Sequence, residues 1–457
     1  MHPNIVTITS FSPSGHGLTE KGWHILGAFP GDTIKAKMYK EADGILYAEI
    51  LEIIEPSKHR TLAPTESPFF DANAPWRYLK REQENIEKLN FVKNLFKEIA
   101  FIDLTSEIAS RAINDKDELN ESQKNELLET HYRNKAAYAF MVDTKDNLAF
   151  ALFTRGIAKS GKIAQTENIL VHPMVNKIGK QFLHFFNQKK IDPRVLKYLT
   201  LRYSYHTNNV VAQILVTETN RKKLPWKKIE LEKLVNQYSE LEGIIVSHSE
   251  PSVRSSKTTK DFYVVGNIEI IEKILDKEYT YHPSQFFQIY PDAFAKILKD
   301  CKRIIADIPN HNEYELLDFF AGIGIIGLHL AGLVQMVHGV EQSPLAGKYA
   351  RKNARNNGIE NYSFTETNVN EALEYIQKKQ ILVVDPARSG LTKKSLENII
   401  EVQPQYIIYI SCNPESQAEN YYELKDHYDI TWSKAYNLFP KTPHIEHVIF
   451  LTKKPTN

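Results

Sequence analysis

The sequence predicts a multi-domain chain with a small N-terminal β-barrel, a central α+β domain and a C-terminal α/β domain built on a doubly wound sheet. Three observations favour this fold class. At 457 residues the chain is too long for one hydrophobic core. Its first segment alternates apolar and polar residues in short runs, and from about residue 285 strand-like and helix-like segments alternate. We therefore expect domains at residues 1–58, 59–284 and 285–457.

The N-terminal segment predicts about five short strands, because glycines punctuate its alternating runs where turns are needed. These glycines are Gly15, Gly17, Gly22, Gly31 and Gly44. Small barrels of this kind often bind nucleic acid, and a purely structural appendage would have the same pattern. Both interpretations stay open on the strands alone.

The central segment predicts a mixture of helices and strands. Residues 76–99 carry an apolar stripe at helical spacing. Residues 198–216 read as two strands joined by a hairpin turn at Thr207, Asn208 and Asn209. The basic loop "ETNRKKLPWKK" that follows is either solvated surface or a contact for RNA.

The C-terminal segment predicts a mainly parallel sheet. Its strands are "YELLDFF", "MVHGV", "ILVVD" and "YIIYI", and helical patterns follow the first two of them, at residues 325–334 and 344–358. Ligands of such sheets bind at the carboxyl ends of the strands. Polar or reactive side chains stand near those ends at Asp318, Glu341, Asp385 and Cys412.

A glycine motif between a strand and a helix indicates an adenosine cofactor. Gly322, Gly324 and Gly327 spell G-x-G-x-x-G, and Glu341 stands about 20 residues on, where a carboxylate can bind ribose hydroxyls. NAD and S-adenosylmethionine both satisfy this pattern. A glycine cluster that serves only close packing is the third interpretation.

Composition narrows the setting. The formal charge of +1 argues against indiscriminate binding of nucleic acid and leaves room for local basic patches. No apolar run approaches the roughly 20 residues that span a bilayer, and the first residues lack the features of a signal peptide, so we expect a cytoplasmic protein without membrane contact. Two cysteines, Cys301 and Cys412, cannot form a disulfide framework or a four-cysteine metal site. Cys301 lies in a helical pattern and is expected to pack there.

The remaining polar motifs suggest chemistry on a pyrimidine. Cys412 follows a buried strand and precedes Asn-Pro, an unusual place for a core cysteine, although packing is the common fate of a lone thiol. Glu446 stands between a proline bend and an apolar run, and Asp385 could act in the site or cap a turn. Uracil C5 becomes nucleophilic once a thiolate adds to C6, and a carboxylate can then remove the C5 proton. His444 and His447 lack partners at metal-ligand spacing.

Taken together, these motifs resemble the RNA 5-methyluridine methyltransferase family, in the branch with an N-terminal TRAM domain. "GHGLTEKGWHILGAFPGDTIKAKM" looks like TRAM, "HYRNKAAYAF" like the central-domain signature and "SQFFQIYPDAF" like the start of the catalytic domain. "DFFAGIGIIGL", "DPARSG", "SCNP" and "TPHIEHV" then follow in the family's order. The resemblance covers nearly the whole chain, and the ordered set is more specific than any one motif.

The resemblance implies a Rossmann-like catalytic domain that uses S-adenosylmethionine to methylate C5 of a uridine in structured RNA. It makes Cys412 the nucleophile that forms an adduct at C6 and Glu446 the base that removes the C5 proton. The substrate we expect is 23S ribosomal RNA in preference to transfer RNA, and we expect a monomer. The residues implied to surround the cofactor are Gln288, Phe320, Glu341, Asn368 and Asp385.

The chain departs from the family's pattern at several places. Tyr290 stands where asparagine is usual, which puts a cofactor or RNA contact in doubt, and residues 416–420 replace a familiar run, which puts the rigidity of that loop in doubt. Relatives with an iron–sulfur cluster have cysteines at four positions that are occupied here by Thr65, Asp71, Ala74 and Val171. We therefore expect no iron–sulfur cluster. The rival functions are an NAD-dependent oxidoreductase and a catalytically silent RNA-binding relative.

Overall fold

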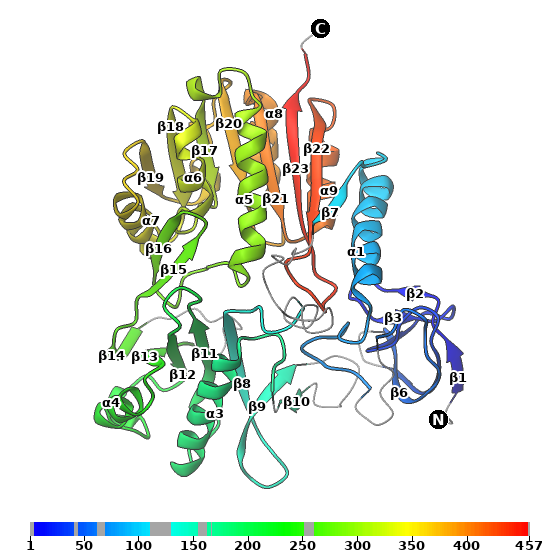
Figure 1. Cartoon of the computed structure of the whole chain (residues 1–457), viewed down its shortest axis with the longest axis vertical. Helices are drawn as coiled ribbons and strands as arrows, with labels where there is room; N and C mark the ends of the chain where they lie inside the picture. The colour runs from blue at the N-terminus through cyan, green and yellow to red at the C-terminus, as the bar shows by residue number, and fades with distance from the viewer. Residues whose placement is uncertain are drawn as a thin grey trace, which may run out of the picture. The chain divides into compact units, whose positions relative to one another are not determined.

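The computed structural model of the protein describes residues 4–40, 44–61, 69–109, 129–153, 162–165, 167–250 and 260–455 (Figure 1). The chain divides into two compact units, each built from segments that are distant in sequence. The first unit comprises Met1–Glu84, Ile113–Ile268 and Phe439–Pro443, and the second comprises Asn85–Ala112, Glu269–Leu438 and His444–Asn457. The domain ends expected after residues 58 and 284 do not coincide with the limits of these units.

A six-stranded sheet forms the N-terminal part of the first unit. The strand order is β1-β5-β6-β4-β3-β2, and the inner face buries Ile8, Ile25, Ile34 and Ile50. The glycine-punctuated runs thus form strands, one more than the five expected, while the TRAM assignment stays a prediction. The bounds are β1 (Asn4–Thr7), β2 (Ser10–Phe11), β3 (Gly17–Leu18), β4 (Trp23–Ile25), β5 (Thr33–Lys40) and β6 (Leu46–Glu55).

Residues beyond position 58 complete this sheet. The buried Asp32 carboxylate accepts hydrogen bonds from Arg60 Nε at 2.8 Å and from Arg60 Nη2 at 2.7 Å. Trp76 Nε1 donates to the carbonyl of Gly15 at 2.9 Å. Because these contacts are buried, the N-terminal sheet is not finished at residue 58. Of the four positions aligned with cluster cysteines, Asp71, Ala74 and Val171 are described, and Thr65 lies outside the described residues.

A seven-stranded sheet with helices α3 (Pro173–Gln188) and α4 (Lys228–Gln237) makes up the rest of the first unit. The hairpin expected at Thr207 to Asn209 is present, and Asn208 takes the left-handed conformation at φ 60°. The strand order is β10-β9-β8-β11-β12-β13-β14. The bounds are β8 (Lys135–Val142), β9 (Leu148–Phe153), β10 (Lys162–Gln165), β11 (Leu196–Tyr203), β12 (Val210–Val216), β13 (Leu241–His248) and β14 (Lys260–Gly266).

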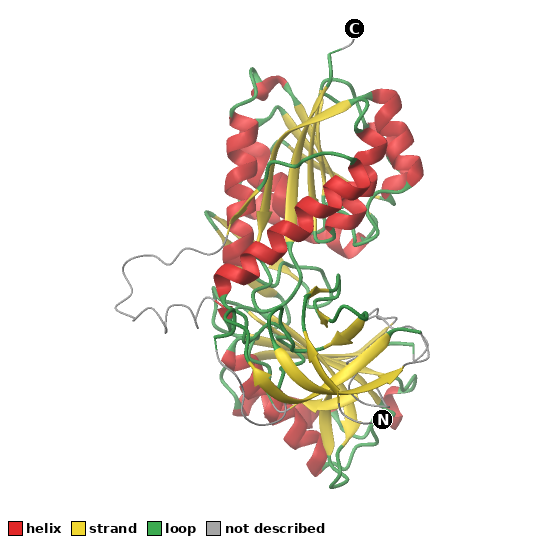
Figure 2. Ribbon diagram, turned by 90° about the vertical axis from the view of Figure 1, so that its right-hand side faces the viewer, coloured by secondary structure: helices red, strands yellow, loops and turns green. Residues whose placement is uncertain are grey.

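The second unit is built on an eight-stranded mixed sheet with helices on both faces (Figure 2). Its order is β19-β18-β17-β20-β21-β23-β22-β7, and the first five strands are parallel, as the alternation of strands and helices predicts. The bounds are β7 (Glu107–Ala109), β17 (Glu315–Phe319), β18 (Met336–Glu341), β19 (Tyr362–Glu366), β20 (Gln380–Val384), β21 (Tyr406–Ser411), β22 (Tyr428–Tyr436) and β23 (Glu446–Lys453).

Helices connect the parallel strands, so their carboxyl ends meet at one edge of the sheet. A hairpin of β15 (Ile270–Ile274) and β16 (Lys277–Tyr281) comes directly before helix α5 in the chain. The helices are α1 (Arg81–Leu95), which continues as a π-helical turn at Phe96–Ala100, α5 (Pro291–Ala306), α6 (Ile325–Leu330), α7 (Pro344–Asn356), α8 (Lys393–Val402) and α9 (Pro414–Leu424). Within the described ranges, no helix is both long enough and apolar enough to span a bilayer.

Candidate active site

Cys412 occupies the first position after β21, where the chain turns into α9. Pro414 starts that helix, and the hydroxyl of Ser411 accepts a hydrogen bond from the backbone N–H of Asn413 at 3.1 Å. The Asn413 side chain donates to the carbonyl of Arg388 at 2.8 Å, which joins this turn to the turn after β20. These hydrogen bonds fix the turn in which Cys412 lies. The Cys412 thiol is free and half-buried, so a ligand can still contact it.

Glu446 lies across the sheet from Cys412. Strands β21 and β23 are antiparallel neighbours, and their last paired residues are Ser411 and His447. One step further along this register brings Cys412 opposite Glu446, the first residue of β23. Glu446 is only 4% exposed. The structure therefore brings together the thiol and the carboxylate that the sequence places 34 positions apart.

Asp385 adds a second carboxyl group to this edge. It directly follows β20, which is the parallel neighbour of β21, and it is half-buried. Burial raises the pKa of Asp385 to about 7. Burial also raises the pKa of Glu446 well above its usual value, and the charge of Asp385 raises it further.

The Cys412 thiol responds to the same surroundings. Burial raises its pKa to about 11, the negative charges of Glu446 and Asp385 add to the rise, and the exposed Arg388 opposes it. Three acidic groups thus share one poorly solvated edge, and each disfavours the ionisation of the others. The position at the strand end does not by itself give a thiolate at neutral pH. A cation at this edge would favour ionisation.

The glycine loop between β17 and α6 has the conformation of a cofactor cradle. Phe320, Gly322 and Gly324 have φ values of 62°, 55° and 86°, in the left-handed region that favours glycine. A Cβ added at Gly322 would meet no atom of the described residues within 4 Å, so the backbone is open to the close approach of a ligand. At Gly324 the added atom would lie 2.8 Å from the hydroxyl of Tyr362, so that glycine serves packing.

Asp318 is hydrogen-bonded to the last glycine of the G-x-G-x-x-G motif. It lies inside β17, fully buried, and its Oδ2 accepts the backbone N–H of Gly327 at 3.0 Å. Burial raises the pKa of Asp318 to about 7. The sequence placed Asp318 among the residues at the strand ends, and the structure gives it a role in bracing the loop.

Glu341 and Asn368 lie at the carboxyl ends of β18 and β19, on the side of β17 away from Cys412. Glu341 ends β18, is half-buried, and accepts the backbone N–H of Ser343 at 3.1 Å. Asn368 is exposed two residues after β19, and its side chain is 3.5 Å from the side-chain oxygen of Gln342, which follows Glu341. These positions suit the hydroxyl and base contacts of an adenosine.

Gln288 and Tyr290 belong to the loop between β16 and α5. Phe287 anchors this loop by stacking on Tyr281, with ring centroids 4.3 Å apart and an interplanar angle of 2°. Gln288 is 8% exposed, and Tyr290 is buried just before the first residue of α5. Phe286, directly before the anchored Phe287, is 68% exposed.

Sequence reasoning missed two polar residues of α9, Gln417 and Asn420, that stiffen the site. The buried Gln417 of α9 donates to the carbonyls of Tyr409 and His447, and it accepts from His447 Nδ1 at 2.6 Å. Asn420 accepts from the backbone N–H of Leu391 at 2.7 Å and from the hydroxyl of Tyr409 at 2.8 Å. Gln417 and Asn420 fall in the run that departs from the family's pattern, so the departure does not loosen this loop. The sequence did offer one signal: Gln417 and Asn420 stand four and seven positions after Asn413, a spacing that places all three on one face of a helix.

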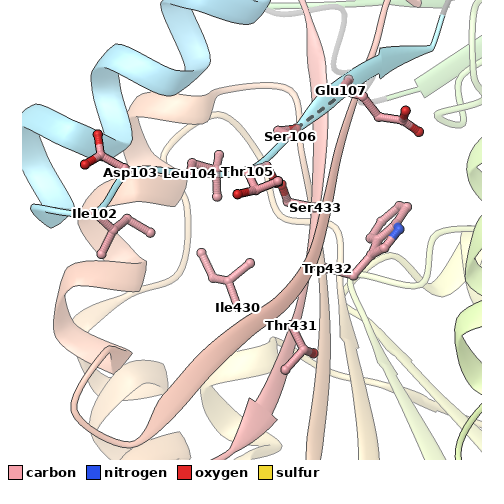
Figure 3. A pocket seen from close by; sticks show the side chains of 10 residues that line it. All are labelled: Ile102, Asp103, Leu104, Thr105, Ser106, Glu107, Ile430, Thr431, Trp432 and Ser433. Atoms are coloured by element: carbon pink, nitrogen blue, oxygen red, sulfur yellow. Dashed lines mark hydrogen bonds between the residues drawn. The ribbon is translucent and has the colours of Figure 1, made fainter.

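A cavity of about 450 Å³ opens at another part of the second unit, at the outer edge of the sheet (Figure 3). The segment before β7 and the middle of β22 line it, and Ser433 Oγ donates to the carbonyl of Thr105 at 2.7 Å. None of the site residues described above lines this cavity. In the described part of the chain, no three His, Cys, Asp or Glu side chains gather as metal ligands.

Comparison with known proteins gives consistent matches along the chain. The model of the tRNA (uracil-5-)-methyltransferase family matches residues 118–454. An uncharacterized RNA methyltransferase of Caldanaerobacter subterraneus subsp. tengcongensis is 28% identical over 452 residues, which cover 97% of this chain and 96% of the relative. One from Nanoarchaeum equitans is 27% identical and covers 99% of this chain and 93% of the relative.

A solved structure shares the fold over the whole chain. It is the Pyrococcus abyssi tRNA (uracil-54, C5)-methyltransferase in complex with S-adenosyl-L-homocysteine. The TM-score is 0.74 with 21% sequence identity, and the match covers 98% of this chain and 100% of that chain. At this identity the likeness establishes the fold.

Proposed function

Because the chain belongs to the tRNA (uracil-5-)-methyltransferase family, we propose that it transfers a methyl group from S-adenosylmethionine to C5 of a uridine in structured RNA. The observation that carries this proposal is the placement of Cys412 opposite Glu446 on neighbouring strands. This chemistry needs a nucleophile and a base at one substrate ring, and the register that continues past the Ser411–His447 pair supports these roles for Cys412 and Glu446.

The residues at the strand ends fit S-adenosylmethionine. The open backbone at Gly322 leaves room for the cofactor to approach closely. The Glu341 carboxylate stands where the ribose hydroxyls would be bound. Phe320, Asn368, Gln288 and Asp385 complete the proposed binding set. When bound, the cofactor supplies an electrophilic methyl group on a positively charged sulfur. Comparison with known proteins gives no support to the alternative of an NAD-dependent oxidoreductase.

The proposed reaction makes and breaks two bonds at the uracil. The Cys412 thiolate adds to C6, and the resulting enolate uses C5 to accept the methyl group. Glu446 then takes the C5 proton, the C6–S bond breaks, and the thiolate leaves. One proton is released overall, because neutral products replace a cationic methyl donor.

The raised pKa values of Cys412, Asp385 and Glu446 are compatible with this mechanism, because the bound cofactor would bring a positive charge to the same edge. In the protein alone the thiol is protonated at neutral pH, since its pKa is about 11. A sulfonium cation at the same edge favours the ionised forms of Cys412, Asp385 and Glu446. The nucleophile is then generated when the methyl donor is in place, which protects the thiol from adventitious chemistry before that moment.

We propose a folded RNA as the substrate, and two classes of RNA follow from different observations. The predicted TRAM domain favours 23S ribosomal RNA, which is our expectation. The name of the matched family and that of the Pyrococcus abyssi protein refer to transfer RNA. The assay therefore offers unmodified transcripts of both classes, with 5-methyluridine mapped in the product.

Trapping of the covalent adduct tests the mechanism. Glu446→Gln should methylate once and stall as a protein–RNA conjugate that survives denaturing electrophoresis, because the C5 proton stays in place. Cys412→Ala should form no conjugate, and Cys301→Ala, which changes the other, buried cysteine, should behave as the wild type. RNA with 5-fluorouridine should trap the wild type.

Two results would contradict the proposal. Cys412→Ala that methylates RNA at the wild-type rate would remove the nucleophile from the mechanism. Wild-type protein that binds RNA but transfers no methyl group to either class would favour the catalytically silent relative.

A further inference from the structure

The basic loop "ETNRKKLPWKK" lines a cavity of the first unit that the catalytic edge does not use. On sequence alone this loop is either solvated surface or a contact for RNA. The cavity has a volume of about 450 Å³, and we call it the basic cavity. Ligand pockets begin at about 300 Å³, so a nucleotide-sized group has room here. The residues that line it are Arg221, Lys222, Lys228, Phe262, Tyr263 and Val264.

Three elements surround the basic cavity. They are the single 3₁₀ turn at Arg221–Lys223, the start of α4 and the strand β14. Helix α4 packs against β13 and β14 (Figure 1). Strand β14 is the last in the order of its sheet. The basic cavity therefore lies at one border of the sheet.

The turn that carries the cations is held in place by its neighbours. The side chain of Asn220 caps the turn by accepting the backbone N–H of Lys222 at 3.0 Å. Leu224 and Trp226, which follow the turn, are buried in the core that also contains α3. Because the segment is already ordered, an anion that binds here loses little affinity to the ordering of the loop.

Positive charge at the basic cavity is only weakly compensated. Residues 221–228 read RKKLPWKK and include no acidic residue, although the whole chain has a net charge of only +1. Arg221 and Lys222 are exposed, and neither forms an ion pair with any residue of the described ranges. Lys228 lies 3.8 Å from Glu232, and it begins α4, where the helix dipole disfavours a cation.

The acidic residues nearby in the sequence have other partners. Glu218 accepts the backbone N–H of Asn220 at 2.8 Å, and Glu230 pairs with Lys189. On β14, Asp261 accepts the hydroxyl of a serine of β13 at 2.7 Å. The cations of the basic turn thus keep a positive potential that attracts an anion.

An aromatic ring orients Arg221. The guanidinium carbon lies 5.5 Å from the centroid of the half-buried Tyr263 ring. This cation–π contact uses the face of the guanidinium and leaves its N–H groups available, and their fork geometry matches two oxygens of a phosphate. Val264 is 43% exposed and adds an apolar surface on which a sugar or a base can pack.

Protection of the sheet edge is an alternative reason for cations at this place, since lysines on an edge strand discourage pairing with another chain. Lys260 of β14 has such a position. Arg221, Lys222 and Lys228 belong to the turn and to α4 instead. Protection of the edge therefore does not account for them.

We propose that the basic cavity binds the backbone of the substrate RNA, with Arg221, Lys222 and Lys228 contacting phosphate oxygens. This inference rests on the proposed function, because a folded RNA is the polyanion that such an enzyme must bind. None of the proposed cofactor or catalytic residues lines the basic cavity, so it contributes affinity and takes no part in the chemistry. Phosphate contacts position an RNA and carry no sequence information.

The first test removes two charges from the basic cavity. Arg221→Gln combined with Lys222→Gln is compared with Lys145→Gln combined with Lys233→Gln, which removes two exposed lysines of the same unit that do not line the cavity. Affinity for unmodified transcripts of transfer RNA and 23S ribosomal RNA is measured at several salt concentrations. The first variant should bind roughly tenfold more weakly, and its slope of log Kd against log salt should fall by about 2, which is about 1 for each lost contact. The control should keep the wild-type slope.

The second test places a negative charge in the basic cavity. Val264→Asp is compared with Val142→Asp, because the two valines lie on strands of the same sheet and are 43% and 44% exposed. Val264→Asp should weaken RNA binding at low salt, and the difference from the wild type should shrink as salt is added. Val142→Asp should bind RNA as the wild type does.

Methyl transfer distinguishes an RNA contact from a structural role of the turn. The variant that lacks Arg221 and Lys222 should keep the wild-type kcat at saturating RNA, while its KM for RNA rises roughly tenfold. Its melting temperature and its affinity for S-adenosylmethionine should equal those of the wild type, because the two side chains are exposed. A lower melting temperature with an unchanged KM would assign the turn to stability alone.

The outcomes separate the basic cavity from the proposed function. Wild-type salt dependence in the variant that lacks Arg221 and Lys222, or equal weakening by Val264→Asp and Val142→Asp, would overturn the RNA contact. If the wild type transfers no methyl group to RNA of either class, the proposed function fails, and weaker, less salt-dependent RNA binding by the variant would still support the contact. Normal methylation by the wild type together with an unchanged KM in the variant would discard the contact alone.

Discussion

The ionisation of Cys412 gives the sharpest check on the electrostatics of the site. A thiol with a pKa of about 11 is only about 0.1% thiolate at pH 8, whereas an ordinary cysteine with a pKa of about 8.5 is about a quarter ionised. The thiolate is the form that reacts with iodoacetamide. The rate of alkylation in the protein alone should therefore keep rising with pH to a midpoint near 11.

Two substitutions should move that midpoint in opposite directions. Glu446→Gln removes a negative charge that raises the pKa of Cys412, so the midpoint should fall by on the order of one unit. Arg388→Gln removes a positive charge that lowers the pKa, so the midpoint should rise. The second shift should be smaller, because the guanidinium is exposed and screened by water.

Pseudo-first-order alkylation followed by mass spectrometry from pH 7 to the alkaline limit of the fold measures these midpoints. Cys301 gives little background, because burial raises its pKa to about 12 and covers the thiol, and Cys412→Ala measures what remains. A wild-type midpoint near 8.5, or an upward shift in Glu446→Gln, would refute the assignment of the raised pKa to burial and to the neighbouring carboxyls.

The cofactor provides a matched comparison of charge. S-adenosylmethionine carries a positive sulfur, and S-adenosylhomocysteine has the same shape without that charge or the methyl group. The first should lower the pKa of Cys412 and the second should not, if the cation acts on the thiol directly. Equal shifts with both ligands would show that ordering of the loop, and not charge, controls the thiol.

Three further predictions concern the rest of the molecule. Asp318→Asn should raise stability above pH 7, measured by urea unfolding, because the pKa of Asp318 rises from 3.8 to about 7 on folding and the wild type loses stability as pH climbs through that interval, whereas asparagine still accepts the Gly327 N–H. An unchanged pH profile would contradict this. Asp32→Ala should cost about 3–5 kcal/mol, because it leaves the buried Arg60 charge without this partner, and a loss below about 1 kcal/mol, typical of exposed pairs, would contradict that. Purified protein should contain no stoichiometric iron or acid-labile sulfide, even when prepared without oxygen, and one cluster per chain would disprove this.

The sequence predicted those strands and loops whose formation depends on residues close together in the chain. The period of the apolar residues and the flanking glycines gave the parallel strands β17, β18, β20 and β21 and the loop at Gly322, because each depends on neighbours within a few positions. The motif resemblance suggested the roles that we propose for Cys412 and Glu446.

Long-range pairing could not be predicted in the same way. Strand β7 joins the edge of a sheet whose other strands begin about 200 residues later, and it pairs with β22 over only three positions. Strand β23 enters antiparallel between β21 and β22, which no local period encodes. Inside the first unit, the packing of the N-terminal sheet likewise depends on buried contacts across the expected boundary at residue 58, such as that of Asp32 with Arg60, and not on composition at that boundary.

The antiparallel entry of β23 brings Glu446 close to Cys412, and the side-chain amide of Gln417 adds hydrogen bonds to both β21 and β23 there. Burial lowers the pKa of His447 to about 3, so the ring is neutral and its Nδ1–H donates to Gln417. The Gln417 amide in turn donates to the carbonyls of Tyr409 on β21 and His447 on β23. These contacts bridge the two strands within three residues of Cys412 and one residue of Glu446. A slip of the register by one position would turn Glu446 to the other face and break all three hydrogen bonds. The departure at Gln417 therefore secures the alignment on which the proposed chemistry depends.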